Sequence, residues 1–239
     1  MTIWNSLARA ATAAGDDILL RQRGDIYEIR FNGIELMSNL NCRSETILAE
    51  RTLRMNGTDD AHVLIGGLGM GFTLRTALDC LGPRARVTVC ELIADIAEWN
   101  RSRIGHLAGH PLRDPRVGLR EDDVLQVLLE SPAAFDVILM DTDNGPDFTV
   151  RPTNDWIYSG NGLVALRRAL RPGGLAAFWS ATVSPDFERR LDAQPWFWRR
   201  EDVPLFAARA DAFHHIYLAS GQAGRIGLPD YRAHAVAAG

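Results

Sequence analysis

The chain has 239 residues, 46% of them hydrophobic, so it can bury the core of one domain with a small N-terminal addition. Its 26 basic and 30 acidic residues give a net charge of −4, so the composition shows no excess of positive charge that would indicate binding to nucleic acid. The chain contains neither a long apolar run nor a charged-then-apolar leader. We therefore expect no membrane span, no signal peptide and a cytoplasmic location. The three cysteines, Cys42, Cys80 and Cys90, form no C-x-x-C pair and are expected to be free thiols.

The N-terminal region combines two patterns. Residues 1–15 are rich in alanine and are predicted to be helical. Residues 17–38 alternate between apolar and polar positions, with breaks at residues 23–25 and at Asn32-Gly33, so we predict a small antiparallel β-meander.

A linking helix is predicted from Ser44, which can cap it, to Met55, because Asn56-Gly57 would end it. We divide the chain accordingly into an N-terminal region, residues 1–56, and a second domain, residues 57–239.

From residue 62 onward, apolar strands alternate with amphipathic helices, which is typical of βαβ units in a parallel sheet covered on both faces. Two strand-like segments, 196–203 and 214–220, follow with only a loop between them and should pair antiparallel. The expected parallel strands lie near 62–66, 86–91, 116–120, 135–141 and 174–180. The expected helices lie near 71–81, 93–105, 123–131, 159–171 and 184–192.

The first of these strands runs into four glycines: Gly66, Gly67, Gly69 and Gly71. Glycines at a strand-to-helix turn allow a positive φ and let a ligand approach the backbone closely. The G-x-G-x-G spacing differs from the dinucleotide fingerprint, and the chain contains no P-loop motif. The pattern therefore favours S-adenosylmethionine. The sulfonium and amino acid tail of this cofactor must lie close to the backbone, but it has no pyrophosphate that the turn would have to bind.

Acidic residues end the next two strands. Glu91 follows the last glycine by about twenty residues, at the position where an acid can accept hydrogen bonds from a ribose diol. Asp122 and Asp123 follow the third strand. One of these two carboxylates can accept the amino hydrogen bonds of adenine while the other caps the next helix, and the sequence leaves the assignment open.

The fourth strand ends in Asp141 and Asp143, followed by Asn144-Gly145-Pro146. Ligands of parallel sheets bind outside the carboxyl ends of the strands, so both acids should face the same ligand-binding region as the glycines. A carboxylate there can hold a cationic acceptor or take a proton from it, which makes Asp141 and Asp143 the candidate catalytic residues. The structural alternative for Asp143 is a turn.

Several other side chains remain open from the sequence. Trp156 and Tyr158 could form an aromatic wall of the site or pack in the core. His214 and His215 lie in a strand pattern without partners at metal-ligand spacing, so we expect no metal. The edge of the meander is a candidate contact between two copies in a homodimer.

Together these segments resemble the spermidine synthase-like group of class I S-adenosylmethionine-dependent transferases, over nearly the whole chain. The family's G-G-G-D-G turn corresponds to residues 66–71, and its V-E-I-D motif to residues 89–93. Its G-D-G motif corresponds to residues 122–124, and its catalytic D-x-x-D-P loop to residues 141–146. We therefore expect a doubly wound α/β sheet of seven strands, with an antiparallel C-terminal hairpin and a small N-terminal β-meander. The resemblance also implies a small-molecule acceptor.

Two positions depart from the family pattern. Gly69 replaces an acid that faces the amino end of decarboxylated S-adenosylmethionine; an anion there would repel the carboxylate of ordinary S-adenosylmethionine by about 1–4 kcal/mol. Asn144 replaces the second acid of the catalytic loop. We therefore predict methyl transfer from S-adenosylmethionine to a small amine or hydroxyl. The alternatives are aminopropyl transfer from the decarboxylated cofactor, another non-methyl alkyl transfer, and a non-catalytic nucleoside-binding module.

Overall fold

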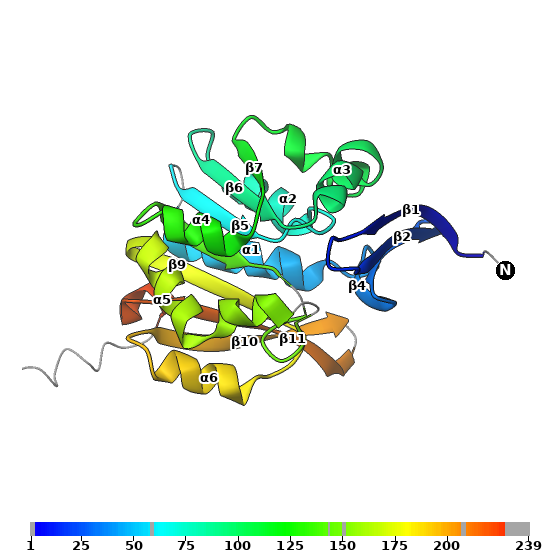
Figure 1. The fold of residues 1–239 in the computed structure, drawn as a ribbon. Helices are drawn as coiled ribbons and strands as arrows, with labels where there is room; N and C mark the ends of the chain where they lie inside the picture. Colours follow the sequence, from blue (N-terminus) through cyan, green and yellow to red (C-terminus); the bar gives the residue numbers. More distant parts are fainter. Residues whose placement is uncertain (1–2, 58–59, 143, 150–151, 207–208, 228–239) are drawn as a thin grey trace, which may run out of the picture.

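A computed structural model describes residues 3–57, 60–142, 144–149, 152–206 and 209–227 (Figure 1). It contains a seven-stranded sheet in the order β10-β11-β9-β8-β5-β6-β7 and a four-stranded antiparallel sheet in the order β1-β2-β3-β4. The large sheet has a parallel part made of β5, β6, β7, β8 and β9. Strand β11 runs antiparallel to both of its neighbours, β9 and β10. The predicted doubly wound α/β fold with a C-terminal antiparallel hairpin is confirmed.

The strands of the large sheet follow the predicted apolar runs closely, because burial on both faces selects uninterrupted apolar sequence. Two strands begin well before their predicted starts at residues 174 and 214. Leu170 of β9 pairs with Phe135 across a register shift, and Arg209 of β11 pairs with Phe206 of β10. The strands are β5 (His62–Gly66), β6 (Arg86–Glu91), β7 (Val117–Glu121), β8 (Phe135–Met140), β9 (Leu170–Ser180), β10 (Phe197–Phe206) and β11 (Arg209–Ser220).

Helices cover both faces of this sheet (Figure 1). The apolar side chains of α1 and α2 pack in one buried cluster, and those of α4, α5 and α6 pack in a second one. The helices are α1 (Arg43–Asn56), α2 (Phe72–Cys80), α3 (Ala94–Ser102), α4 (Val124–Glu130), α5 (Gly160–Ala169) and α6 (Pro185–Asp192). Short 3-10 turns are η1 (Gly105–Ala108), η2 (Pro111–Arg113), η3 (Pro152–Tyr158) and η4 (Ala223–Ile226). None of the helices described is long and apolar enough to cross a membrane.

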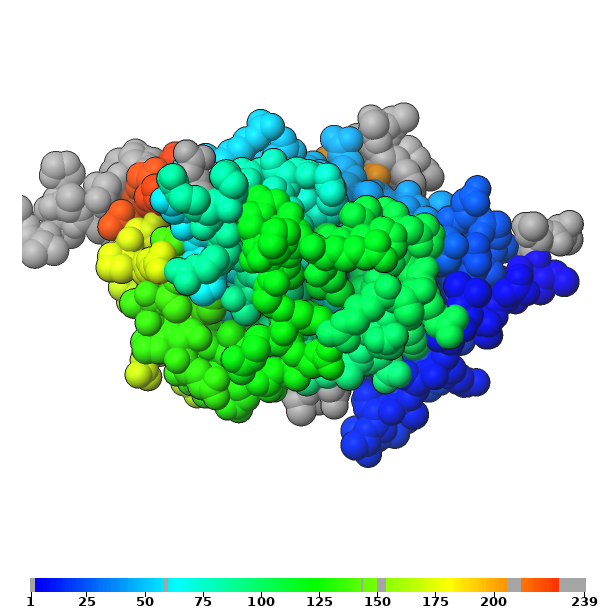
Figure 2. All heavy atoms as spheres, turned by 90° about the horizontal axis from the view of Figure 1, so that it is seen from above, coloured from blue at the N-terminus to red at the C-terminus, as the bar shows by residue number. Residues whose placement is uncertain are grey.

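The small sheet consists of β1 (Asn5–Ala11), β2 (Asp17–Arg23), β3 (Ile26–Phe31) and β4 (Ile34–Ser38). It projects from the body beside α3, and Figure 2 shows it at the edge of the molecule. Its apolar face, including Ile18 and Phe31, packs against Ile96 and Trp99 of α3. This packing brings β4 next to the carboxyl ends of the parallel strands.

The helix predicted over residues 1–15 is wrong, because residues 5–11 form β1. This strand pairs antiparallel with β2, and an Arg9–Asp17 ion pair links the two strands. Backbone pairing with β2 and the partial burial of Leu7, Ala8 and Ala10 outweigh the helical preference of alanine, which is only a weak local term.

The predicted cap of α1 is also wrong. The helix begins one residue before Ser44, its N-cap is Cys42, and no side chain caps it. Ser44 is instead buried inside the first turn, where its hydroxyl bonds to Glu45 and His214. A long-range partner on β11 has taken the hydroxyl that the local pattern assigned to the helix end.

Candidate active site

A cavity of about 550 Å³ lies at the carboxyl ends of the parallel strands, a size typical of small-molecule sites. Its wall combines segments far apart in the sequence: β4, the first turn of α1, the glycine turn, the ends of β6, β7 and β8, and β11. Of the residues predicted to bind or react, Gly67, Gly69, Glu91, Asp122, Asp123 and Asp141 line it.

The glycine turn carries the backbone from β5 into α2. Gly67 has a φ of +90°, and its N–H donates to the carbonyl of Cys90 at 2.8 Å. A Cβ on Gly67 would stand 2.2 Å from the carbonyl oxygen of Asp141, so only glycine allows β5 and β8 to approach here. Gly66 and Gly71 lie outside the cavity lining; Gly71, with a φ of +86°, precedes the first turn of α2.

Gly69 lies under the meander. A Cβ at this position would stand 2.5 Å from the sulfur of Met37 on β4, which also lines the cavity. The apolar thioether of Met37 therefore occupies the space into which the side chain of an acid at position 69 would extend. The carbonyl of Gly69 accepts a hydrogen bond from the buried Asn100 amide at 2.7 Å, a contact that no local sequence pattern indicated.

Glu91 ends β6 with a buried carboxylate. One oxygen accepts the N–H of Leu68 in the glycine turn at 3.0 Å, and the other accepts the N–H of Ile93 at 2.9 Å. Burial raises the pKa of Glu91, and the backbone donors oppose this effect by stabilising the charge. The carboxylate thus holds the glycine turn to β6 and retains lone pairs for a ribose diol, the role predicted for it.

Replacing Glu91 by alanine should weaken binding of a nucleoside cofactor about 10- to 150-fold, the equivalent of 1.5–3 kcal/mol for a charge-assisted hydrogen bond. Calorimetric titration with S-adenosylmethionine and its decarboxylated form measures the effect. Glu121→Ala is the matched control, since Glu121 faces Glu91 in register on β7 but bonds to Arg101. Equal affinities in the two folded variants would contradict the ribose role.

The two acids after β7 have different partners. Asp123 is the N-cap of α4, because its side chain accepts the N–H of Leu125 at 2.9 Å. Asp122 accepts from the N–H of Asp123 and from Arg120. The cap role left open by the sequence thus belongs to Asp123, and Asp122 becomes the better candidate for adenine, a role that stays a prediction.

Asp141 follows β8 and meets two groups that no sequence motif assigned to the site. Thr73, in the first turn of α2, donates its hydroxyl to the Asp141 carboxylate. Glu45, on α1, lines the same cavity. Burial and then the negative charge of Glu45 raise the pKa of Asp141 to about 7, against a smaller lowering by Thr73. A carboxylate with this pKa can exchange a proton near neutral pH.

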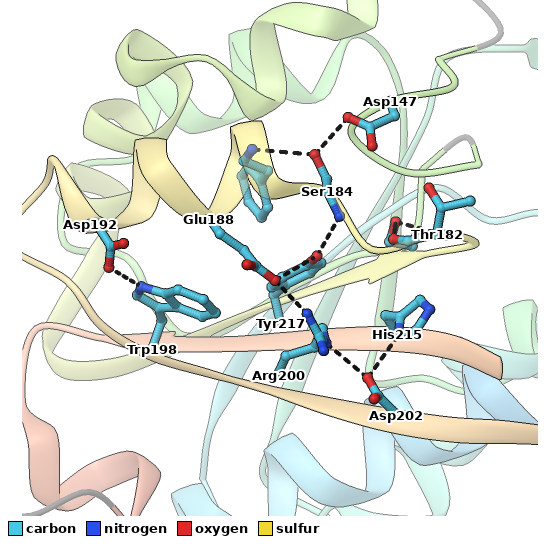
Figure 3. Close-up of polar contacts among 12 residues, drawn as sticks. Asp147, Thr182, Ser184, Glu188, Asp192, Trp198, Arg200, Asp202, His215 and Tyr217 are labelled. Atoms are coloured by element: carbon cyan, nitrogen blue, oxygen red, sulfur yellow. Dashed lines mark hydrogen bonds and ion pairs between the residues drawn. The ribbon is translucent and has the colours of Figure 1, made fainter.

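The loop after Asp141 bonds to the residue that caps α6. Asp143, the second candidate catalytic residue, lies outside the described residues, whereas Asn144 lines the cavity. Further along, Asp147 accepts the Ser184 hydroxyl at 2.6 Å, and Tyr217 accepts the Ser184 N–H at 2.8 Å (Figure 3).

Trp156 and Tyr158 pack in the core and line no part of the cavity. Tyr158 is fully buried and donates its hydroxyl to the carbonyl of Thr142 at 3.0 Å. The two adjacent histidines of β11 lie on opposite faces. His214 lines the cavity, while His215 bonds to Asp202 at 2.8 Å in the network of Figure 3.

A scan of the sequence against protein-family models gave no match, and a search of curated proteins gave no relative. Solved structures do match. Spermidine synthase from Thermotoga maritima has a TM-score of 0.73 at 18% identity, over 91% of this chain and 73% of that one. A spermidine synthase in complex with the transition-state analogue AdoDATO has a TM-score of 0.71 at 18% identity, over 91% and 72%. A probable spermidine synthase from Corynebacterium glutamicum has a TM-score of 0.64 at 21% identity, over 93% and 81%.

The chain has the spermidine synthase fold. The resemblance inferred from the motifs is therefore confirmed at the level of the fold. At identities of 18% and 21% the spermidine synthase fold does not assign the reaction, so the roles of individual residues are inferred from the cavity itself.

Proposed function

We propose that this protein is a transferase that uses an S-adenosylmethionine-type cofactor to alkylate a small amine. The observation that carries the proposal is the cavity that joins the glycine turn and Glu91 to Asp141. In this proposal the first two hold the nucleoside, and Asp141 serves the acceptor.

The cavity fits such a cofactor. Gly67 and Gly69 leave backbone open to the cavity at positions where a side chain would collide with Asp141 or Met37. Glu91 would bind the ribose and Asp122 the adenine. When bound, the cofactor would supply an electrophilic carbon on a positively charged sulfur.

The acceptor end contains two carboxylates, Asp141 and Glu45, in one partly buried wall. Together they favour a cationic amine over a neutral or anionic acceptor. Asp141 would orient the amine and take a proton from its ammonium form, because only the neutral amine has the lone pair that attacks the electrophilic carbon. Because the ionised form is the base, the rate should rise with pH through the pKa of Asp141, about 7.

The group transferred separates two candidates. Aminopropyl transfer from decarboxylated S-adenosylmethionine is the reaction type of the spermidine synthases that share the fold, and the comparisons support it better than the methyl transfer predicted from the sequence. Methyl transfer is kept as the second candidate for one reason. Gly69 and the sulfur of Met37 leave no acid at the position that would favour a decarboxylated cofactor.

Mass spectrometry of the nucleoside product distinguishes these candidates. We expect incubation with decarboxylated S-adenosylmethionine and a panel of small amines to yield methylthioadenosine. S-adenosylhomocysteine formed from ordinary S-adenosylmethionine would instead establish methyl transfer. Binding of either cofactor with neither product, across the whole amine panel, would contradict the proposed enzyme and favour a nucleoside-binding module.

A further inference from the structure

A chain of polar side chains runs along one wall of the cavity, beginning at Asp141. Glu45 lies next, close enough for its charge to raise the pKa of Asp141. The Ser44 hydroxyl is 2.7 Å from a Glu45 carboxylate oxygen and 2.8 Å from Nδ1 of His214. Three elements, β8, α1 and β11, therefore meet in one connected polar wall.

The hydrogen bonds of Ser44 determine which nitrogen of His214 carries the proton. An ionised carboxylate only accepts, so Ser44 must use its single proton toward Glu45. The Ser44 oxygen is then the acceptor for His214, and Nδ1 must be the donor. In the neutral imidazole this leaves Nε2 with a free lone pair. Burial raises the pKa of Glu45, and the hydrogen bond from Ser44 opposes this shift because it stabilises the ionised carboxylate.

The surroundings keep His214 neutral. Its ring lies edge-on to Trp179 of β9, with the ring centroids 4.7 Å apart. Burial, with a smaller contribution from His215, lowers the pKa of His214 to about 4. Glu45 is separated from the ring by Ser44, and Asp202 on β10 is engaged by His215 on the opposite face of the sheet. Among the described residues no group bonds to His214 Nε2, which remains free for a ligand of the cavity.

We propose that His214 Nε2 accepts a hydrogen bond from an uncharged donor of the acceptor molecule, whose ammonium group binds at Asp141 and Glu45. The acceptor class is then a small amino alcohol, or another amine with one positive charge and one neutral donor. A second ammonium group would meet a neutral ring where it needs a carboxylate. This inference rests on the proposed function only in taking the cavity as an amine site.

Two phenylalanine variants on the same strand test the assignment. His214→Phe keeps an aromatic ring beside Trp179 and removes both nitrogens. His215→Phe makes the same change at the next residue of β11, on the face shown in Figure 3. Calorimetry should compare amino alcohols of two to five carbons with the alkylamine and the diamine of each length, in the absence of turnover.

We expect wild-type protein to bind the best amino alcohol about threefold to tenfold more tightly than the alkylamine of the same length, the worth of one neutral hydrogen bond. His214→Phe should abolish this preference for the hydroxyl group, and His215→Phe should preserve it. Nitrogen-15 spectra of labelled histidine should show the Nδ1–H form of His214, and Ser44→Ala should release that tautomer preference.

The inference would be overturned if wild-type protein bound the amino alcohol and the alkylamine equally, or if the preference survived in His214→Phe. It would also be overturned if the diamine bound more tightly than the amino alcohol, or if no amine bound. Turnover separates it from the proposed function. Product formation without a His214-dependent preference would refute the inference alone. A His214-dependent preference without product from either cofactor would refute the proposed enzyme and leave the binding assignment standing.

Discussion

Replacing Asp141 by asparagine should lower the rate of group transfer about 10²–10⁴-fold while leaving cofactor affinity nearly unchanged. The amide keeps the size of the side chain and can still accept the Thr73 hydroxyl, but it cannot take a proton from an amine. The measurement is the single-turnover rate at saturating cofactor and acceptor, followed against pH. The wild-type rate should rise through about pH 7, and the residual rate of the variant should lose that limb.

The same substitution should stabilise the protein at alkaline pH. In the folded state the pKa of Asp141 is raised from 3.8 to about 7, so its contribution is most favourable below pH 3.8 and is lost as the pH rises through 7. A pKa change of this size corresponds to about 4 kcal/mol as an upper value. Urea unfolding of Asp141→Asn should therefore show a gain at pH 9 that disappears near pH 4.

Asp136→Asn is the matched control for the rate. Asp136 lies at the opposite end of β8, where it accepts from Arg171 and from the N–H of His62. Its substitution removes a carboxylate from the same strand without touching the cavity, so transfer should persist in the folded variant. If Asp141→Asn retains near wild-type rate, Asp141 is structural, and Asp143 becomes the next candidate base.

Replacing Gly67 by alanine should cost about 2–5 kcal/mol of unfolding free energy. The φ of +90° disfavours any residue with a Cβ, and the new atom would lie 2.2 Å from the backbone carbonyl of Asp141. Because that oxygen belongs to the backbone, no side-chain rotation relieves the overlap. Cofactor affinity should fall as well, since the collision separates the glycine turn from β8.

Two other glycines separate the causes of this loss. Gly57 has a φ of +71°, and no atom lies within 4 Å of the position that a Cβ would take, so Gly57→Ala reports backbone strain alone, about 1 kcal/mol. Gly118, within β7, has open space around it and an ordinary strand φ, so Gly118→Ala should be close to neutral. A Gly67→Ala variant as stable as Gly118→Ala would show that the turn tolerates a side chain.

The alternation of apolar strands and amphipathic helices was sufficient to predict the large sheet and its antiparallel end. It also predicted that Glu91 and Asp141 lie together at the carboxyl ends of the parallel strands. These features depend on local periodicity and on a general rule for parallel sheets, so the order of residues alone contains them. The same local reasoning failed at residues 5–11. There, pairing with β2 and packing against the body outweighed the helical preference of alanine.

The proposed acceptor side of the cavity could be recognised only from the tertiary structure. Glu45 and His214 are separated by most of the chain, and no spacing rule links Ser44 to β11; only the packing of α1 beside β11 makes their hydrogen bonds. The assignment of the helix cap to Asp123 likewise required backbone geometry that adjacent acids cannot reveal in a sequence. Local pattern thus predicted most of the helices and strands, because these follow from short-range periodicity, and it supplied the residues of the proposed cofactor end. Long-range packing decided the wall of Asp141, Glu45, Ser44 and His214, because its charges and hydrogen bonds arise between residues that meet only in the folded chain.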